Sequence, residues 1–246
     1  MTLLYQKNQR QCFYGNPIGI LVLDVQYPCV PGNVANATTY NFPVRYKVVK
    51  GASVERLLWA KDKSLIQPFI DAALELQEEG VGAITGACGF MALFQKEVAR
   101  ELDIPVFLSS LLQVPFINQI LGGKKRIGVI SADASALTDE FFKAVGVLEG
   151  TKLALAGMEN QPEFSGAILK NKGSLDSQII EEEVVHVAKE LKKKHDDLGA
   201  ILLECSDLPP YSHAVQQAVS LPVFDFISMI NYVESAIIKH PYHGFM

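Results

Sequence analysis

An internal repeat constrains this chain more than any other feature of its sequence. Residues 81–107, VGAITGACGFMALFQKEVARELDIPVF, align without a gap with residues 198–224, LGAILLECSDLPPYSHAVQQAVSLPVF. Eight of the 27 aligned pairs are identical, and Cys88 and Cys205 are 117 positions apart. Each copy reads as a strand, a turn that carries a cysteine, a helix and a second strand. We therefore expect two similar lobes, each presenting one cysteine.

Short apolar runs bounded by turn residues recur along the chain and predict strands. They span 18–24, 44–50, 81–86, 104–110, 126–131, 198–204 and 221–226. Several are apolar throughout, which is typical of strands covered on both faces of a parallel sheet. Helical patterns lie between them, over 62–79, 91–102, 134–145 and 174–195. This alternation predicts an α/β fold of two similar lobes, each with a mainly parallel sheet flanked by helices, related by a pseudo-twofold axis.

The two lobes are expected to enclose the active site. We assign residues 1–117 and 226–246 to the first lobe and 118–225 to the second. Ligands bind such sheets at the carboxyl ends of their strands, so Cys88 and Cys205 would face one cleft. A helix that begins just after each cysteine could lower the pKa of its thiol. One thiolate and one thiol could then move a proton from one face of a carbon to the other without a cofactor.

Composition limits the classes of partner. The net charge of −5 disfavours nucleic acid, because phosphate binding requires a basic surface. The four cysteines show no CxxC spacing, so we expect neither a metal nor a cofactor. The sequence has no secretory signal pattern and no apolar run of membrane-spanning length. We therefore expect a cytoplasmic protein without a membrane partner.

These motifs resemble those of the aspartate/glutamate racemase superfamily, which includes amino-acid and hydantoin racemases, maleate isomerases and arylmalonate decarboxylases. The resemblance rests on Asp24 after the first strand, GACGF around Cys88, LECSDLPPY around Cys205, and GVISADASALTDEFF at 128–142. It implies that Cys88 and Cys205 are the catalytic acid and base. It further implies that Asp207 assists Cys205 and that Asp24 acts near the first cysteine. From the residues alone, Asp24 could instead cap a turn and Asp207 a helix.

Substrate recognition is predicted at the two cysteine turns. Many racemases of this superfamily carry Cys-Asn-Thr at the first turn, whereas this chain has Cys88, Gly89 and Phe90, so side-chain donors for a carboxylate are missing there. Backbone N–H groups at the starts of the following helices could bind the anion instead. The loop 27–49 should overhang the cleft, and its Arg45 could fix a carboxylate. The candidate substrate-binding residues are Gly89, Phe90, Ser131, Ser135, Ser206 and Arg45.

The preferred function is a cofactor-independent isomerase, a racemase that inverts the α-carbon of a small carboxylate such as an amino acid or a hydantoin. Retention of two equivalent cysteines favours racemisation over the chemistry of an arylmalonate decarboxylase or a maleate isomerase, which remain alternatives. A non-catalytic small-molecule binding protein is the alternative from another class. Dimers are common among such folds, so the chain could form a homo-oligomer.

Overall fold

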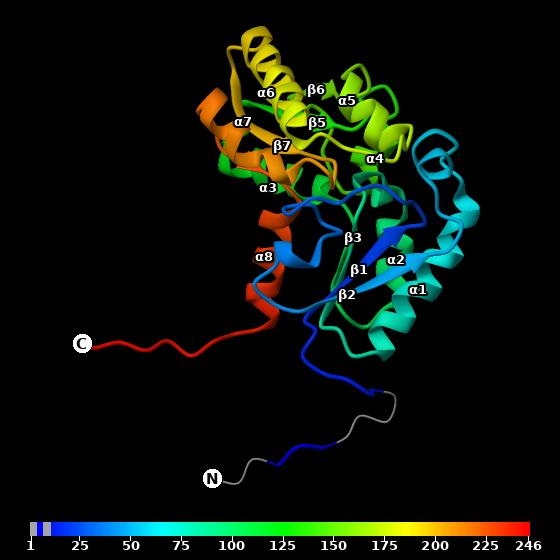
Figure 1. The fold of residues 1–246 in the computed structure, drawn as a ribbon. Coiled ribbons are helices and arrows are strands. Elements are labelled where there is room, and N and C mark those ends of the chain that lie inside the picture. The colour runs from blue at the N-terminus through cyan, green and yellow to red at the C-terminus, as the bar shows by residue number, and fades with distance from the viewer. Residues whose placement is uncertain (1–3, 7–10) are drawn as a thin grey trace.

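Two four-stranded parallel sheets form the framework of the computed structural model, which describes residues 4–6 and 11–246 (Figure 1). The first sheet has the order β2-β1-β3-β4, with β1 Ile18–Leu23, β2 Val44–Val49, β3 Ala83–Gly86 and β4 Val106–Phe107. The second has the order β6-β5-β7-β8, with β5 Arg126–Ser131, β6 Leu153–Gly157, β7 Leu198–Leu203 and β8 Val223–Phe224. The predicted fold of two similar α/β lobes is confirmed.

Helices cover both faces of the first sheet. Because side chains alternate along a strand, β1 presents Leu21 and Leu23 to one face and Ile18 and Ile20 to the other. The first pair packs with α1, Ile66–Glu78, and the second pair packs with α8, Phe226–Ile237. This two-sided burial explains why the strand is apolar throughout.

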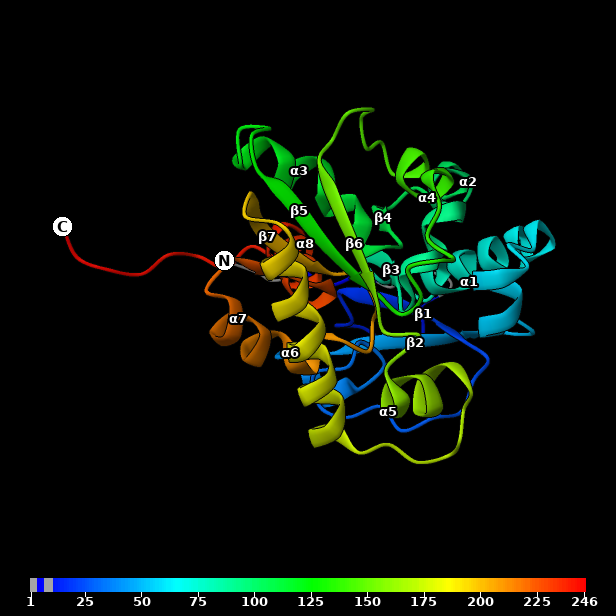
Figure 2. The ribbon, with the colours of Figure 1, turned by 90° about the horizontal axis from the view of Figure 1, so that it is seen from above.

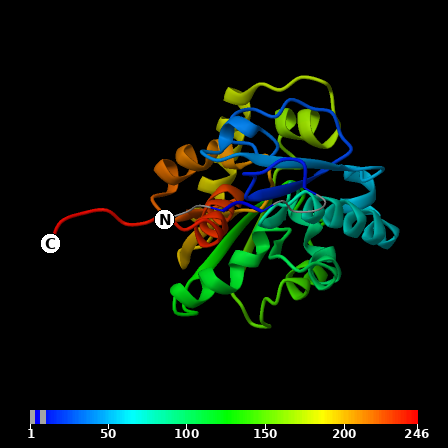
Figure 3. The ribbon, with the colours of Figure 1, turned by 90° about the horizontal axis from the view of Figure 1, so that it is seen from below.

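The second sheet is covered in the same way. On β5, Ile130 packs with α6, Ser177–Lys194, whereas Ile127 and Val129 pack with α3, Gln113–Ile120. Figures 2 and 3 show the helices on the two sides of the sheets from above and from below. The remaining helices are α2 Gln95–Glu101, α4 Asp139–Ala144, α5 Pro162–Phe164 and α7 Ser212–Val219.

Each lobe contributes one helix to the other lobe, and the two lobes share a core. α3 follows β4 of the first sheet but contacts β5 of the second, and α8 follows β8 but contacts β3. The expected boundary at residue 117 therefore falls inside α3. A continuous apolar cluster runs from α1 to α4, and within it the rings of Phe90 and Phe141 meet edge to face with centroids 5.0 Å apart. This shared core fixes the two sheet ends relative to each other.

The local structure differs from the sequence prediction in three ways: an additional strand, 3-10 helices and π-helical turns. β6 was not predicted because its LALAG segment is rich in small residues and lies at a sheet edge. A 3-10 helix, η4 Gly89–Phe94, separates the first cysteine from α2, and η7 Pro209–Tyr211 precedes α7 in the second lobe. Each lobe also has a π-helical turn, η2 Glu55–Trp59 and η6 Ser165–Leu169. Among the described residues no helix is both long and apolar enough to cross a membrane.

Candidate active site

A narrow pocket lies between the lobes where four strands end. Leu23 ends β1, Cys88 follows β3, Ala132 follows β5 and Glu204 follows β7, and all four line the pocket. Its cavity volume is about 20 Å³, so the pocket is tight in this structure. The carboxyl ends of parallel strands are the usual ligand-binding edge of such sheets. The position therefore marks this pocket as the candidate active site.

Both predicted cysteines reach this pocket. Cys88 comes directly before η4 of the first lobe, and Cys205 occupies the equivalent turn after β7 of the second. Cys205 is buried and Cys88 is partly buried, and neither forms a disulfide. The repeat thus brings two thiols from residues 117 positions apart into one site.

Burial controls the acidity of the two thiols. It is the largest cause raising the pKa of Cys88 well above its usual range, and the nearby Glu204 carboxyl adds to the effect. Backbone N–H groups of Phe90 and Met91 at the start of η4 lower that pKa, but by less. Burial also raises the pKa of Cys205, with a further contribution from Asp207. The expected lowering by a helix start is present at Cys88 but is outweighed by desolvation.

Asp207 is the hydrogen-bonded centre of the second turn. Its Oδ2 accepts hydrogen bonds from the Cys205 thiol at 3.4 Å and from the Tyr27 hydroxyl at 3.1 Å. Its Oδ1 accepts from Asn33 Nδ2 at 2.5 Å. Burial raises the pKa of Asp207, and these three donors oppose the rise. The arrangement gives Cys205 a neighbouring carboxylate that can accept the thiol proton.

Tyr27 and Asn33 come from the loop that follows β1. It packs against the second lobe, where Val34 N donates to Ser206 O at 3.3 Å. Gly32 lies against Pro210 so closely that a Cβ at this position would come within 2.8 Å of the proline backbone. This part of the loop covers the second cysteine turn, as expected for a loop after a strand end.

Glu204 is a buried carboxyl that the sequence reasoning missed. It lies at the end of β7, its side chain is fully buried, and its Oε2 accepts a hydrogen bond from Ser131 Oγ at 2.8 Å. Burial raises the pKa of Glu204 to about 7, and the Ser131 bond opposes the rise. A signal was available in the sequence, because a charged residue directly after the apolar run AILL is unusual for a strand end inside a core.

Three other predicted binding residues belong to the pocket. Gly89, Phe90 and Ser206 line it, and Ser206 Oγ donates to Ala87 O of the first lobe at 2.8 Å. Ser131 is one hydrogen bond away, through Glu204. These contacts tie the turn of one lobe to the turn of the other.

The structure does not bring Asp24, Arg45 and Ser135 to the pocket. Asp24 is exposed and its Oδ2 accepts from Gly51 N at 3.2 Å, in the turn after β2. Arg45 lies on the edge strand β2 and pairs with Glu79 at 2.6 Å. Ser135 donates to Asp133 within its own turn at 2.6 Å. Each of these side chains has a local structural partner away from the cysteines.

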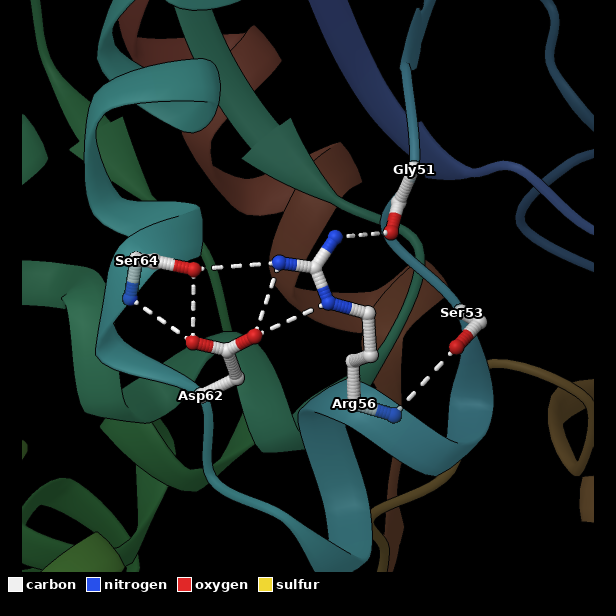
Figure 4. Close-up of polar contacts among 5 residues, drawn as sticks. All are labelled: Gly51, Ser53, Arg56, Asp62 and Ser64. Atoms are coloured by element: carbon white, nitrogen blue, oxygen red, sulfur yellow. Dashed lines mark hydrogen bonds and ion pairs between the residues drawn. The ribbon is translucent and has the colours of Figure 1, made fainter.

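The side walls of the pocket are apolar and come from both lobes. Val54 and Leu58 lie at or beside η2, and Ile168 and Leu169 lie in η6. Figure 4 shows what holds the first of these segments in shape: the Arg56 guanidinium donates to Asp62 Oδ2 at 2.7 and 2.9 Å, to Gly51 O and to Ser64 Oγ. The walls therefore suit methyl or other apolar groups of a ligand.

The pocket lining carries acidic groups without basic ones. Among the described residues that line it there is no lysine, arginine or histidine, whereas Glu204 and Asp207 both contribute carboxyl groups. In the described part of the chain no cluster of three or more His, Cys, Asp or Glu side chains is placed to hold a metal ion. Proton transfer by thiol and carboxyl groups is the chemistry that these residues can perform.

No family model matches the chain, but comparison with curated proteins gives clear relatives. It is 33% identical over 236 residues to dimethylsulfoniopropionate lyase 3 of Emiliania huxleyi (strain CCMP1516), covering 92% of this chain and 61% of that one. It is 31% identical over 233 residues to the dimethylsulfoniopropionate lyase of Durusdinium sp. clade D, covering 92% and 77%. The chain thus spans about three fifths to three quarters of the length of these relatives.

Solved structures agree on the fold. Unliganded arylmalonate decarboxylase superposes with a TM-score of 0.58 at 15% identity, over 90% of this chain and 92% of that one. The aspartate racemase of Picrophilus torridus gives a TM-score of 0.59 at 14% identity, over 90% and 94%. The fold of the aspartate/glutamate racemase superfamily, expected from the cysteine motifs, is confirmed by these likenesses.

Proposed function

Because the chain belongs to the dimethylsulfoniopropionate lyase family, we propose that it is a cofactor-independent lyase that cleaves a β-sulfonium carboxylate of this kind. The observation that carries the proposal is the Cys205–Asp207 pair in a pocket where none of the described lining residues has a basic side chain. A substrate with its own positive charge offsets the negative charge that this pair holds. The preferred class is therefore a lyase in place of the racemase expected from the sequence.

The chemistry is an elimination that starts at the carbon next to the carboxylate. Asp207 takes the thiol proton of Cys205, and the resulting thiolate removes the α-proton of the substrate. The electron pair of the broken C–H bond forms the carbon–carbon double bond. The bond from the β-carbon to sulfur breaks, and its electrons leave with the sulfur. Dimethylsulfoniopropionate would give dimethyl sulfide and acrylate. The α-proton stays on Cys205 as its thiol proton, and the proton that Asp207 took passes to solvent.

The side chains that line the pocket support this orientation of the substrate. The apolar walls at Leu58, Ile168 and Leu169 can pack against the two methyl groups on sulfur. The rings of Tyr27 and Phe90 also line the pocket, and aromatic faces attract a desolvated cation. The carboxylate then lies toward the turns at Gly89 and Ser206, where the polar groups of the site gather.

Proton NMR in deuterated water tests the proposal directly. Incubation with dimethylsulfoniopropionate should give the vinyl signals of acrylate together with dimethyl sulfide, and Cys205→Ala should abolish both. Cys12→Ala is the matched control, because Cys12 is exposed and lies outside the pocket. Unchanged substrate with wild-type protein, or full activity in Cys205→Ala, would refute the lyase mechanism.

A racemase remains the second candidate, and one observation favours it. Cys88 and Cys205 occupy equivalent turns of the two lobes, which is the arrangement that two-base inversion requires. The same NMR experiment with aspartate, glutamate, substituted hydantoins and arylmalonates separates the candidates. Exchange of an α-proton without elimination would identify racemisation, and it should be lost on Cys88→Ala as well as on Cys205→Ala.

A further inference from the structure

Glu204 has one carboxyl oxygen that no group of the protein satisfies. Its Oε2 accepts from Ser131 Oγ, whereas Oε1 is the buried side-chain nitrogen or oxygen atom without a hydrogen-bond partner among the described residues. Leaving such an atom unpaired in a core costs free energy, and native structures rarely do so without a reason. Since Glu204 lines the pocket, a bound ligand is the natural partner of Oε1.

Both lobes hold this carboxyl in place. A Cβ on Gly89 would lie 1.7 Å from Glu204 Oε1, so the carboxyl occupies the space that a side chain at position 89 would need. The Glu204 backbone is also anchored, because Ser110 Oγ of the first lobe donates to its carbonyl at 2.9 Å. Glu204 therefore reaches across the lobe interface to the turn of Cys88. It stands where the first cysteine turn lacks a side-chain donor of its own.

We propose that Glu204 acts as a neutral acid that donates a hydrogen bond from Oε1 to the carboxylate of the substrate, so that ligand binding takes up one proton from solvent. This inference rests on the proposed function and deepens it, because it assigns the group that recognises the carboxylate. It also explains why position 89 is a glycine, because any larger residue there would displace the donor.

The charges around Glu204 require a proton at this position. Among the described residues, the titratable groups that face the site are Cys88 from the first lobe, Cys205 and Asp207 from the turn after β7, and Tyr27 from the loop after β1, and none of them is a cation. A carboxylate that enters beside Glu204 is repelled unless the two carboxyl groups share a proton. Burial already raises the pKa of Glu204 to about 7, and a second carboxylate at close range raises it further.

The same donor would assist the chemical step. Negative charge accumulates on the substrate carboxylate as the α-proton leaves, and a fixed donor gains strength as that charge develops. The proton stays on Glu204 throughout the step and returns to solvent when the product carboxylate departs. Loss of one such donor costs about 100-fold in kcat, so Glu204→Leu should show a loss of that order. Glu204→Gln keeps a donor of the same size and should stay within about tenfold of wild type.

Calorimetry with a substrate analogue that has a much poorer leaving group than a sulfonium tests the inference. The probe is 3-(trimethylammonio)propionate, titrated in two buffers of different ionisation enthalpy at about pH 6 and about pH 8. With a pKa of about 7, roughly nine tenths of the free Glu204 side chains are ionised at about pH 8. Wild type should therefore take up close to one proton per ligand at the higher pH and almost none at the lower. Glu204→Gln should take up none at either, and the exposed Glu182→Gln on α6 should match wild type.

The outcomes separate this inference from the lyase function. Proton release at about pH 6 would overturn it, since Glu204 would then be the anion that faces the cationic head. Absence of proton exchange at about pH 8, or no binding of the probe, would overturn it too. These readings need only the wild-type protein, so they stand even where a variant fails to fold. Proton uptake without turnover of dimethylsulfoniopropionate would refute the lyase reaction and leave the donor role supported.

Discussion

Replacing Glu204 by glutamine should change the pH dependence of stability in a way that follows from burial. Burial raises the pKa of Glu204 from 4.5 to about 7, so the folded protein holds a proton that the unfolded chain releases. The free energy of unfolding of wild type therefore falls as pH rises from about 4.5 to about 7, and the loss is complete above that. Glutamine has no proton to release, so Glu204→Gln escapes this loss.

The magnitude comes from the size of the shift. A rise from 4.5 to about 7 corresponds to roughly 3 kcal/mol at high pH, of which roughly 2 to 3 kcal/mol develops between about pH 5 and pH 8.5. The difference in unfolding free energy between Glu204→Gln and wild type should thus move by that amount in favour of the variant. Any constant cost of the amide is the same at both pH values and cancels.

Urea unfolding followed by circular dichroism at the two pH values measures this difference. Every other titrating group is common to both proteins, so the comparison isolates residue 204. Glu182→Gln makes the same chemical change on the exposed surface of α6 and should leave the difference near zero. A change smaller than about 1 kcal/mol, or one in favour of wild type at high pH, would show that folding does not raise the pKa of Glu204 and would refute the reasoning.

Three further predictions concern the turns around the pocket. Asp207→Asn removes the acceptor of the thiol proton and should lower kcat about 100-fold with a much smaller effect on KM, as measured by release of dimethyl sulfide. Gly89→Ala should destabilise the fold by about 1–3 kcal/mol in the presence of Glu204 and by less in a Glu204→Ala background, because the new Cβ would overlap the carboxyl, whereas its close approach to the Glu204 backbone oxygen at 2.7 Å is common to both backgrounds. Gly166→Ala, whose Cβ meets only a flexible lysine side chain at 3.3 Å, is the control in the same urea assay, and equal costs in both backgrounds would contradict the overlap. Iodoacetamide near pH 7.5 should modify exposed Cys12 well before the two pocket thiols, and mass spectrometry that finds the reverse order would contradict the raised thiol pKa values.

The sequence carried most of the fold because the repeat and the buried strands leave strong signals. Strands covered on both faces appear as unbroken apolar runs, and the gapless alignment of two such units requires two equivalent sheets. Edge strand β6 lacks this signal, since its residues are only partly buried and include two alanines. The sequence assignment placed residues 226–246 with the first lobe, where α8 contacts β3, but the contact of α3 with β5 could not be seen, because a helix pattern does not say which neighbouring sheet covers its apolar face.

The site was predictable where a residue is fixed by the repeat, and not where it depends on the direction of a side chain. Cys88 and Cys205 follow equivalent strands, so topology alone brings them together. Asp24 also follows a strand end, but its carboxylate turns to Gly51 instead of the pocket. Tyr27 reaches Asp207 only because the loop after β1 folds across to the other lobe. Such a contact depends on loop packing, which leaves no periodic pattern in the sequence.

The two cysteines are equivalent in topology but differ in chemical surroundings, and this difference bears on the type of reaction. Cys205 donates to the Asp207 carboxylate and also has the Asp207 backbone N–H beside it, whereas the groups that stabilise a thiolate at Cys88 are the backbone N–H groups of η4. A racemase must use either thiol as the base, since it runs in both directions across one carbon. An elimination needs one base and a good leaving group, so it tolerates this asymmetry. A single thiol that is hydrogen-bonded to a carboxylate, in a pocket where the described lining has no basic side chain, is therefore better suited to removing a proton than to returning one on the opposite face.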